Sequence, residues 1–262
     1  MRKDAIQVEE SRLVGVANLD DYKVIKERHR VFPAIFEQRQ HTNILDIAAG
    51  VGCAANRIKN GYTTNLVASD ITPTCLRILH ELGITTLAFD IDDPTASFPF
   101  VDKQFDAVVS LVTLEHLIYF DHFLTEIYRI LTDDGFLYIS TPNYAAPEYL
   151  MNLIITGKTF HDPLSPEEKY EFYAHVRYFT YRTMVDVVRH HQFTPDTVYL
   201  ALPEGSTRYK ALQTSSKFLA LGFRYTMWLK HNLLPARMAA EPILCCQKNS
   251  PINHRRIRKV VL

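Results

Sequence analysis

Residues 43–52 read NILDIAAGVG, and this motif carries the strongest structural signal in the chain. The apolar pair Ile44-Leu45 predicts a buried strand, and Gly50 and Gly52 predict a tight turn directly after it. Because the chain has only 9 glycines among 262 residues, two glycines one residue apart indicate a specific backbone requirement. Such a turn either adopts a positive φ or brings the backbone close to a ligand. After a parallel strand, it also exposes the N–H groups of the next helix to that ligand.

Strand and helix patterns alternate around this motif. Segments that read as strands lie at residues 42–48, 64–70, 85–90, 105–112, 136–143, 196–202 and 242–249. Helical patterns lie between the first and second, the second and third, and the fourth and fifth of these strands. One of them is residues 72–83, where Pro73 suits the first helical position. Strands that alternate with helices predict an α/β fold whose parallel sheet is covered on both faces.

Length and composition favour one large domain, because 47% of the 262 residues are hydrophobic. We expect a flexible segment at residues 1–19, the folded domain at 20–248 and a basic tail at 249–262. Within the domain, residues 144–178 lack a clear hydrophobic period, which predicts a loop region on the acceptor side. Residues 206–238 form a helical insertion between the last two expected strands.

The charge balance and the cysteines exclude several function classes. Lys and Arg total 29, as do Asp and Glu, so nothing in the composition calls for a nucleic-acid partner. The four cysteines form no C-x-x-C pair and have no zinc-type spacing, which favours reduced thiols. The chain shows no apolar signal core and no apolar run near the length of a membrane span. We therefore expect a cytoplasmic protein.

Acidic residues follow three successive expected strands. Asp46 lies in the first, Asp70 ends the second and Asp90 ends the third. A carboxylate at the second strand end can accept both hydroxyls of a ribose, and ligands of open α/β sheets bind at this edge. Asp90 with the neighbouring Ile91 suits an adenine ring. Together with the glycine turn, the three acids predict a pocket for one nucleoside-like ligand.

Several motifs together resemble the class I S-adenosylmethionine-dependent methyltransferases. They are NILDIAAGVG, LVASD, FDAVVSLVTLEHL, FLTEIYRILTDDGFLYISTPN and HVRYFTYRTMVDVVRHHQF. The last two resemble the branch that holds ubiquinone-pathway and sugar- or lipid-modifying enzymes. The resemblance covers roughly residues 24–202. It departs from the family pattern at Ala48, where the first glycine of the motif usually stands, and at Ala49.

The resemblance implies a Rossmann-like, seven-stranded, mostly parallel sheet with helices on both faces and an antiparallel last strand. It implies S-adenosyl-L-methionine as cofactor and in-line transfer of its methyl group to a small-molecule, sugar or lipid-linked acceptor. The residues that it assigns to the cofactor are Arg28, Asp46, Ala48, Gly50, Gly52, Asp70, Ile71, Asp90, Ile91 and Leu111. Among these, Asp70 would hold the ribose, and Arg28 would pair with the cofactor carboxylate.

The acceptor side is less sharply defined. His116, just past the fourth strand, is the candidate general base, because histidine titrates near neutral pH. Candidate acceptor-binding residues are Tyr144, His161, His175 and Arg177. We expect no metal, because the acids of the segment FDIDDP read as a polar exit from a strand into a loop.

Two questions stay open, the role of residues 215–232 and whether the chain is catalytically active. Residues 215–232 mix apolar and basic side chains, so they could touch a membrane surface, cover the active site or form a homodimer contact. The chain could also be a catalytically inactive, methyltransferase-like binding or regulatory subunit. A nicotinamide-dependent oxidoreductase is disfavoured, because the sequence lacks a complete G-x-G-x-x-G motif.

Overall fold

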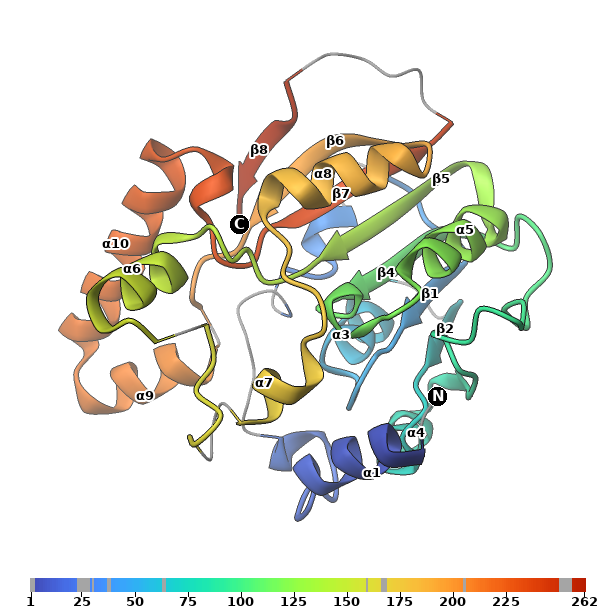
Figure 1. Cartoon of the computed structure of the whole chain (residues 1–262), viewed down its shortest axis with the longest axis horizontal. Coiled ribbons are helices and arrows are strands. Elements are labelled where there is room, and N and C mark those ends of the chain that lie inside the picture. Colours follow the sequence, from blue (N-terminus) through green and yellow to red (C-terminus); the bar gives the residue numbers. More distant parts are fainter. Residues whose placement is uncertain are drawn as a thin grey trace.

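A computed structural model describes residues 3–22, 29, 31–36, 39–62, 65–158, 160–165, 169–204, 206–249 and 256–262. Within these ranges the fold is a single twisted sheet with helices on both faces (Figure 1). The strands are β1 (Ile44–Ile47), β2 (Leu66–Ser69), β3 (Thr85–Leu87), β4 (Phe105–Leu111), β5 (Leu131–Ser140), β6 (Phe193–Leu200), β7 (Ile243–Lys248) and β8 (Arg258–Val261).

The order of the strands across the sheet is β3-β2-β1-β4-β5-β7-β6-β8. Neighbouring strands run parallel except at β7, which is antiparallel to both β5 and β6. This arrangement confirms the predicted α/β class, the mostly parallel sheet and the antiparallel strand β7. Because the chain reverses its strand order at β1, the loops after β1 and β4 open on a common edge, where ligands of such sheets bind.

Helices surround the sheet. They are α1 (Lys3–Arg12), α3 (Cys53–Gly61), α4 (Pro73–Glu81), α5 (Phe120–Ile130), α6 (Pro147–Thr156), α7 (Lys169–Ala174), α8 (Tyr181–His190), α9 (Thr207–Ser215) and α10 (Lys217–Leu233). Short 3-10 turns are η1 (Leu19–Asp21), η2 (Ala34–Phe36), η3 (Leu114–His116) and η4 (Ala236–Met238).

Alternating strand residues build a core on each face of the sheet. On one face, Leu45 and Val108 pack with Ile127 of α5 and with residues of α8. On the other, Ile44 and Val109 pack with residues of α3 and of the segment 31–36. Successive strand side chains point to opposite faces, so a strand that is apolar throughout must be covered on both.

The sheet has eight strands among the described residues, one more than the sequence predicts. The additional strand β8 lies in the expected basic tail and pairs in parallel with β6. Its Lys259 donates hydrogen bonds to the carbonyl oxygens of His231, Asn232 and Leu234, at 2.6, 3.0 and 3.0 Å. This lysine caps the carboxyl end of α10, where carbonyl groups lack helical partners. Sequence reasoning missed β8 because its basic residues resemble an exposed tail.

The amino-terminal segment also contains regular structure. Residues 3–12, within the segment expected to be flexible, form α1, and Glu10 on it accepts hydrogen bonds from the backbone nitrogen and hydroxyl of Thr74 at 2.9 and 2.7 Å. These contacts tie α1 to the first turn of α4. A carboxylate there also suits the positive end of the helix dipole.

Candidate functional site

The turn between β1 and α3 has a left-handed backbone at three positions. The φ angles are 55° at Ala48, 57° at Gly50 and 85° at Gly52, which is the N-cap of α3. A Cβ at Gly52 would lie 2.7 Å from Cδ2 of Leu79, whereas a Cβ at Gly50 would meet no atom within 4 Å. Gly52 is therefore required for packing against α4, whereas Gly50 borders open space.

Asp46 lies at the base of this turn. Only 2% of its surface is exposed, and no described group donates a hydrogen bond to its Oδ2 atom. Burial, followed by the nearby charge of Asp70, raises the pKa of Asp46 from 3.8 to about 7. A buried carboxyl oxygen without a partner is costly, so this position fits a cationic or hydrogen-bond-donating ligand.

Asp70 directly follows β2 and holds the turn from the opposite side. Its Oδ2 accepts the backbone N–H of Gly50 at 2.9 Å. Its Oδ1 accepts the N–H groups of Ile71 and Thr72 at 2.8 and 2.9 Å. The carboxylate thus fixes the turn after β1 against the start of α4, and Oδ2 keeps capacity to accept a further hydrogen bond.

The other predicted cofactor residues lie along the same edge. Asp90 follows β3 in the loop, and its Oδ1 accepts the N–H of Asp92 at 2.9 Å. Ile91 packs against the core on the α5 face. Leu111 ends β4, and its carbonyl oxygen accepts the Thr113 hydroxyl at 3.3 Å. Arg28 lies outside the described residues.

Further buried polar atoms line the carboxyl edge of the sheet. Among the described residues, the hydroxyls of Ser69, Ser110, Ser140 and Thr141 are buried without a hydrogen-bond partner. They stand at or next to the ends of β2, β4 and β5. Sequence reasoning missed them, although a small polar residue that ends an apolar strand is a readable signal. Together with Asp46, they fit a polar ligand at this edge.

The acceptor-side histidines and Tyr144 form one cluster. The Tyr144 hydroxyl lies 2.6 Å from Nδ1 of His175 and 2.9 Å from Nε2 of His161. The rings of His116 and His175 lie 4.7 Å apart, and Nδ1 of His116 lies 3.1 Å from the carbonyl oxygen of Ala174. The structure therefore brings together His116, Tyr144, His161 and His175.

Burial controls the charge of these histidines. Burial lowers the pKa of His116. Burial, followed by the neighbouring His116 and His161, lowers the pKa of His175 to about 3. Both rings are therefore neutral at pH 7, and each keeps a nitrogen lone pair that can accept a hydrogen bond or bind a metal ion.

Arg177 lies beside this cluster in a different role. Its backbone N–H donates to the carbonyl oxygen of Glu115 at 3.0 Å, and its Nη2 donates to the carbonyl oxygen of Ile118 at 3.0 Å. The guanidinium thus ties the segment after α7 to the loop that leads into α5. Sequence reasoning missed Tyr149 and Phe160, whose rings lie 5.0 and 4.6 Å from the ring of Tyr144. With Tyr178, at 5.0 Å, they form an aromatic wall around Tyr144.

A sequence family described as a methyltransferase domain matches residues 45–139, which extend from β1 into β5. The matched segment includes the turn after β1 and the acids Asp46, Asp70 and Asp90. No curated protein sequence matches the chain.

Solved structures share the fold of almost the whole chain. A chain of the Haloferax volcanii complex between the Trm112 methyltransferase activator and a methyltransferase is 15% identical, with a TM-score of 0.60 over 95% of this chain and 100% of that one. A Thermotoga maritima S-adenosylmethionine-dependent methyltransferase is 15% identical, with a TM-score of 0.55 over 94% of this chain and 93% of that one.

Phosphoethanolamine N-methyltransferase 2 of Haemonchus contortus, solved with S-adenosyl-L-methionine, is 16% identical with a TM-score of 0.56. The match covers 94% of this chain and 57% of that chain. At such identities the likeness shows the fold, which is the α/β fold of S-adenosylmethionine-dependent methyltransferases.

Proposed function

We propose that the protein is an S-adenosylmethionine-dependent methyltransferase. The observation that carries this proposal is the pairing of an open, left-handed turn at Gly50 with two acids, Asp46 and Asp70, on its two sides. The domain match over residues 45–139 and the fold shared with a protein solved with this cofactor support it.

Each group along the sheet edge has a role in this proposal. Bound S-adenosylmethionine supplies a methyl group that is already activated on a sulfonium. Asp46 would face the cationic methionine end, and Oδ2 of Asp70 would accept a ribose hydroxyl. Asp90 and Ile91 would contact the adenine. The open space at Gly50 lets the backbone approach the cofactor closely.

The cluster around Tyr144 would hold the acceptor. His116 follows the carboxyl end of β4 and Tyr144 that of β5, at the sheet edge that carries the proposed cofactor site. His161 and His175 join them from the segments after α6 and α7. Alignment of donor and acceptor supplies most of the catalysis in such a displacement. Where the acceptor loses a proton, His116 is the candidate base, because its lowered pKa keeps the ring neutral.

The exposed faces of α6 and α10 favour an acceptor linked to a lipid. Ile154 and Ile155 on α6 are both 72% exposed, and Phe218 on α10 is 87% exposed. An ion pair between Glu148 and Lys230 joins the start of α6 to the end of α10. Because α6 begins shortly after Tyr144, its first turn lies next to the proposed acceptor site (Figure 1).

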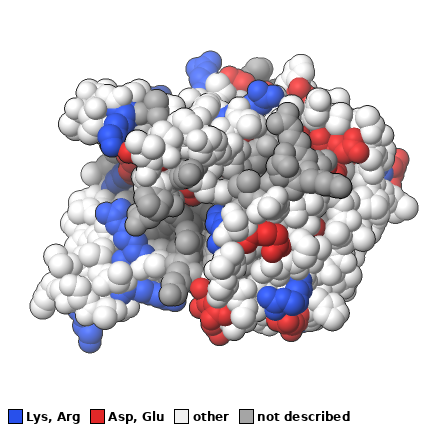
Figure 2. Space-filling model, turned by 60° about the horizontal axis from the view of Figure 1, so that its bottom comes forward, with Lys and Arg blue, Asp and Glu red and all other residues white. Residues whose placement is uncertain are grey.

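The charge around these helices matches an anionic membrane surface. Residues 205–240 contain Arg208, Lys210, Lys217, Arg224, Lys230 and Arg237, and no Asp or Glu. Figure 2 shows this side of the molecule, at the left, as largely uncharged surface with patches of Lys and Arg. None of the described helices is long and apolar enough to cross a membrane. An apolar face flanked by basic residues instead predicts contact with the bilayer surface.

Vesicle sedimentation tests the membrane contact. The protein should sediment with phosphatidylcholine–phosphatidylglycerol vesicles and much less with phosphatidylcholine alone. Phe218→Glu and Ile154→Glu should release it. Val101→Glu, at a 70% exposed apolar residue before β4, should not. Equal binding of all variants would contradict this contact, as would a stable dimer that Phe218→Glu dissociates.

Calorimetry with S-adenosylmethionine and S-adenosylhomocysteine tests the methyltransferase itself. Micromolar binding, together with transfer of a labelled methyl group to a lipid extract, is the expected result. Absence of cofactor binding would contradict the proposal. Binding without transfer to any acceptor would favour the alternative of an inactive, methyltransferase-like subunit.

A further inference from the structure

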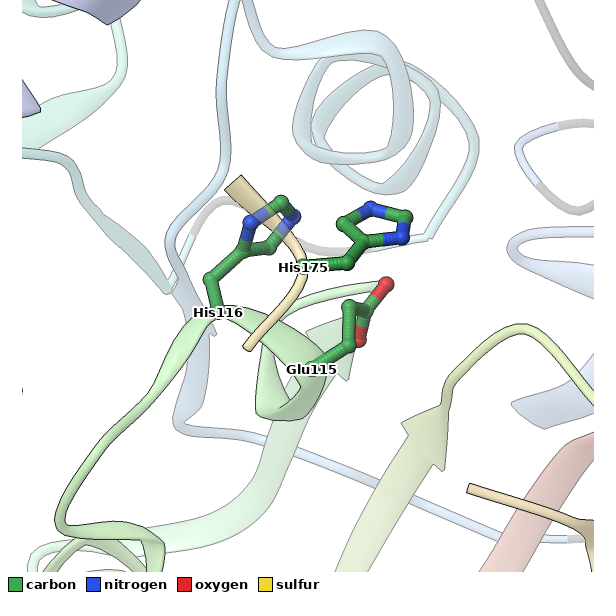
Figure 3. Close-up of side chains that lie close together, drawn as sticks. All are labelled: Glu115, His116 and His175. Atoms are coloured by element: carbon green, nitrogen blue, oxygen red, sulfur yellow. The ribbon is translucent and has the colours of Figure 1, made fainter. Parts of the chain in front are cut away.

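Three potential metal ligands meet within the acceptor cluster, two of them its own histidines. Glu115, His116 and His175 each offer one ligand atom, and these atoms lie within 4.8 Å of one another. Figure 3 shows the two imidazole rings and the carboxylate converging from η3 and from the segment after α7. Glu115 and His175 are buried, and His116 is partly exposed.

The backbone around the three side chains is held in place from both segments. The N–H groups of Val176 and Arg177 both donate to the carbonyl oxygen of Glu115, at 2.9 and 3.0 Å. The hydrogen bond from Nδ1 of His116 to Ala174 adds a third connection. Rigid support of this kind positions ligands before the ion binds.

Hydrogen bonds at Nδ1 leave the other ring nitrogen of both histidines for a metal. The carbonyl oxygen of Ala174 can only accept, so Nδ1 of His116 carries the proton and Nε2 keeps its lone pair. His175 takes the same tautomer when its Nδ1 donates to Tyr144, whose hydroxyl then donates to Nε2 of His161. Metal-binding histidines commonly donate their second N–H in this way.

We infer that Glu115, His116 and His175 bind one divalent transition-metal ion of the zinc type. Two neutral imidazoles and a carboxylate are a ligand set of zinc sites that keep a fourth position for water. The two nitrogen ligands disfavour Mg²⁺, which prefers oxygen. A divalent cation would also compensate the charge of the buried Glu115 carboxylate.

Binding requires a small contraction of the cluster. At a metal–ligand distance of about 2.0 Å, tetrahedral ligand atoms lie roughly 3.3 Å apart. The ligand atoms therefore move inward by roughly an ångström through side-chain rotation. In the metal-bound protein, His116 is a ligand rather than the general base. The sequence predicts no metal here, because the ligands come from two segments that only the fold brings together.

Zinc titration of the chelator-stripped, full-length protein tests the site without S-adenosylmethionine. We expect one tightly bound Zn²⁺ per chain, measured by competition with a chromophoric chelator and by elemental analysis. Glu115→Gln, which keeps the side-chain volume, and His175→Ala should each abolish this binding. Tyr144→Phe should weaken it by about 10- to 100-fold, because Tyr144 orients His175.

His190→Ala serves as the control, because this exposed histidine ends α8 away from the cluster. It should bind Zn²⁺ as the unmodified protein does. Circular dichroism verifies that each variant is folded, and the Co²⁺ absorption spectrum should show no thiolate coordination. The inference is wrong if the unmodified protein binds no Zn²⁺ at micromolar concentration, or if Glu115→Gln retains full binding. Because no cofactor is used, this result is independent of the methyl-transfer proposal.

Discussion

The backbone nitrogen of Gly50 lies 2.9 Å from Oδ2 of Asp70, which joins the turn after β1 to the end of β2. The same carboxylate receives the N–H groups of Ile71 and Thr72 at the start of α4. One side chain therefore shapes the turn and offers an acceptor to a ligand in it. This double role makes Asp70 the residue whose replacement should affect the proposed cofactor site most directly.

Asp70→Ala should weaken S-adenosylmethionine binding by roughly 1.5–3 kcal/mol, the range for a hydrogen bond to a charged group. Calorimetry measures the change in affinity. Asp93→Ala is the matched control, because its Oδ1 bonds the backbone N–H of Thr95 within an exposed loop. Equal affinity of the Asp70→Ala variant and the control would refute the ribose contact.

Gly50→Ala and Gly52→Ala should separate ligand binding from packing. Both residues have positive φ, which costs a residue with a Cβ about 1–2 kcal/mol. Gly52→Ala adds a clash with Leu79 and should lower the free energy of unfolding further. The added methyl group of Gly50→Ala meets no protein atom, so this variant should lose more cofactor affinity than Gly52→Ala and less stability. Urea unfolding measures the stability of both variants, and calorimetry measures their cofactor affinity. A greater loss of stability in Gly50→Ala, or a greater loss of affinity in Gly52→Ala, would contradict these roles.

Ala48→Gly should stabilise the protein. Ala48 has φ 55°, in the left-handed region that glycine adopts without steric cost. Glycine relieves the left-handed strain but adds entropy to the unfolded chain, so the expected net gain is about 0.5–1 kcal/mol. Ala54→Gly, inside helix α3, should instead destabilise by about 1 kcal/mol. Equal losses in both variants, measured by urea unfolding, would argue against strain at Ala48.

Asp46→Asn should change how stability depends on pH. In the folded protein the pKa of Asp46 is raised from 3.8 to about 7, mainly by burial. Asp46 therefore stays protonated to a higher pH in the folded state than in the unfolded state. As a result, the free energy of unfolding falls as pH rises from about 4 to 7. The loss corresponds to at most about 4 kcal/mol above pH 7.

Asparagine carries no charge at any of these pH values, so the Asp46→Asn variant should lack this decrease. Urea unfolding at pH 4, 5.5 and 7.5, without cofactor, compares the two proteins. The stability difference should grow in favour of the variant as pH rises. Parallel pH profiles would show that Asp46 ionises normally in the folded protein.

Local patterns in the sequence determined the α/β class, the strand–turn–helix at residues 43–61 and the series of strand-end acids. These features follow from nearest-neighbour chemistry: apolar runs form buried strands, and glycines permit positive φ. The aromatic and histidine residues near 144, 161 and 175 were also readable as acceptor candidates, because they follow the fifth strand.

Contacts between distant segments were decided only by the tertiary structure. Strand β8 exists because β6 offers an edge to pair with, which residues 258–261 do not reveal alone. The raised pKa of Asp46 depends on burial, and the cluster of Glu115, His116 and His175 depends on hydrogen bonds between η3 and the segment after α7. Burial, and the meeting of side chains from distant segments, arise only when the chain packs. No periodic pattern in the sequence therefore indicates them.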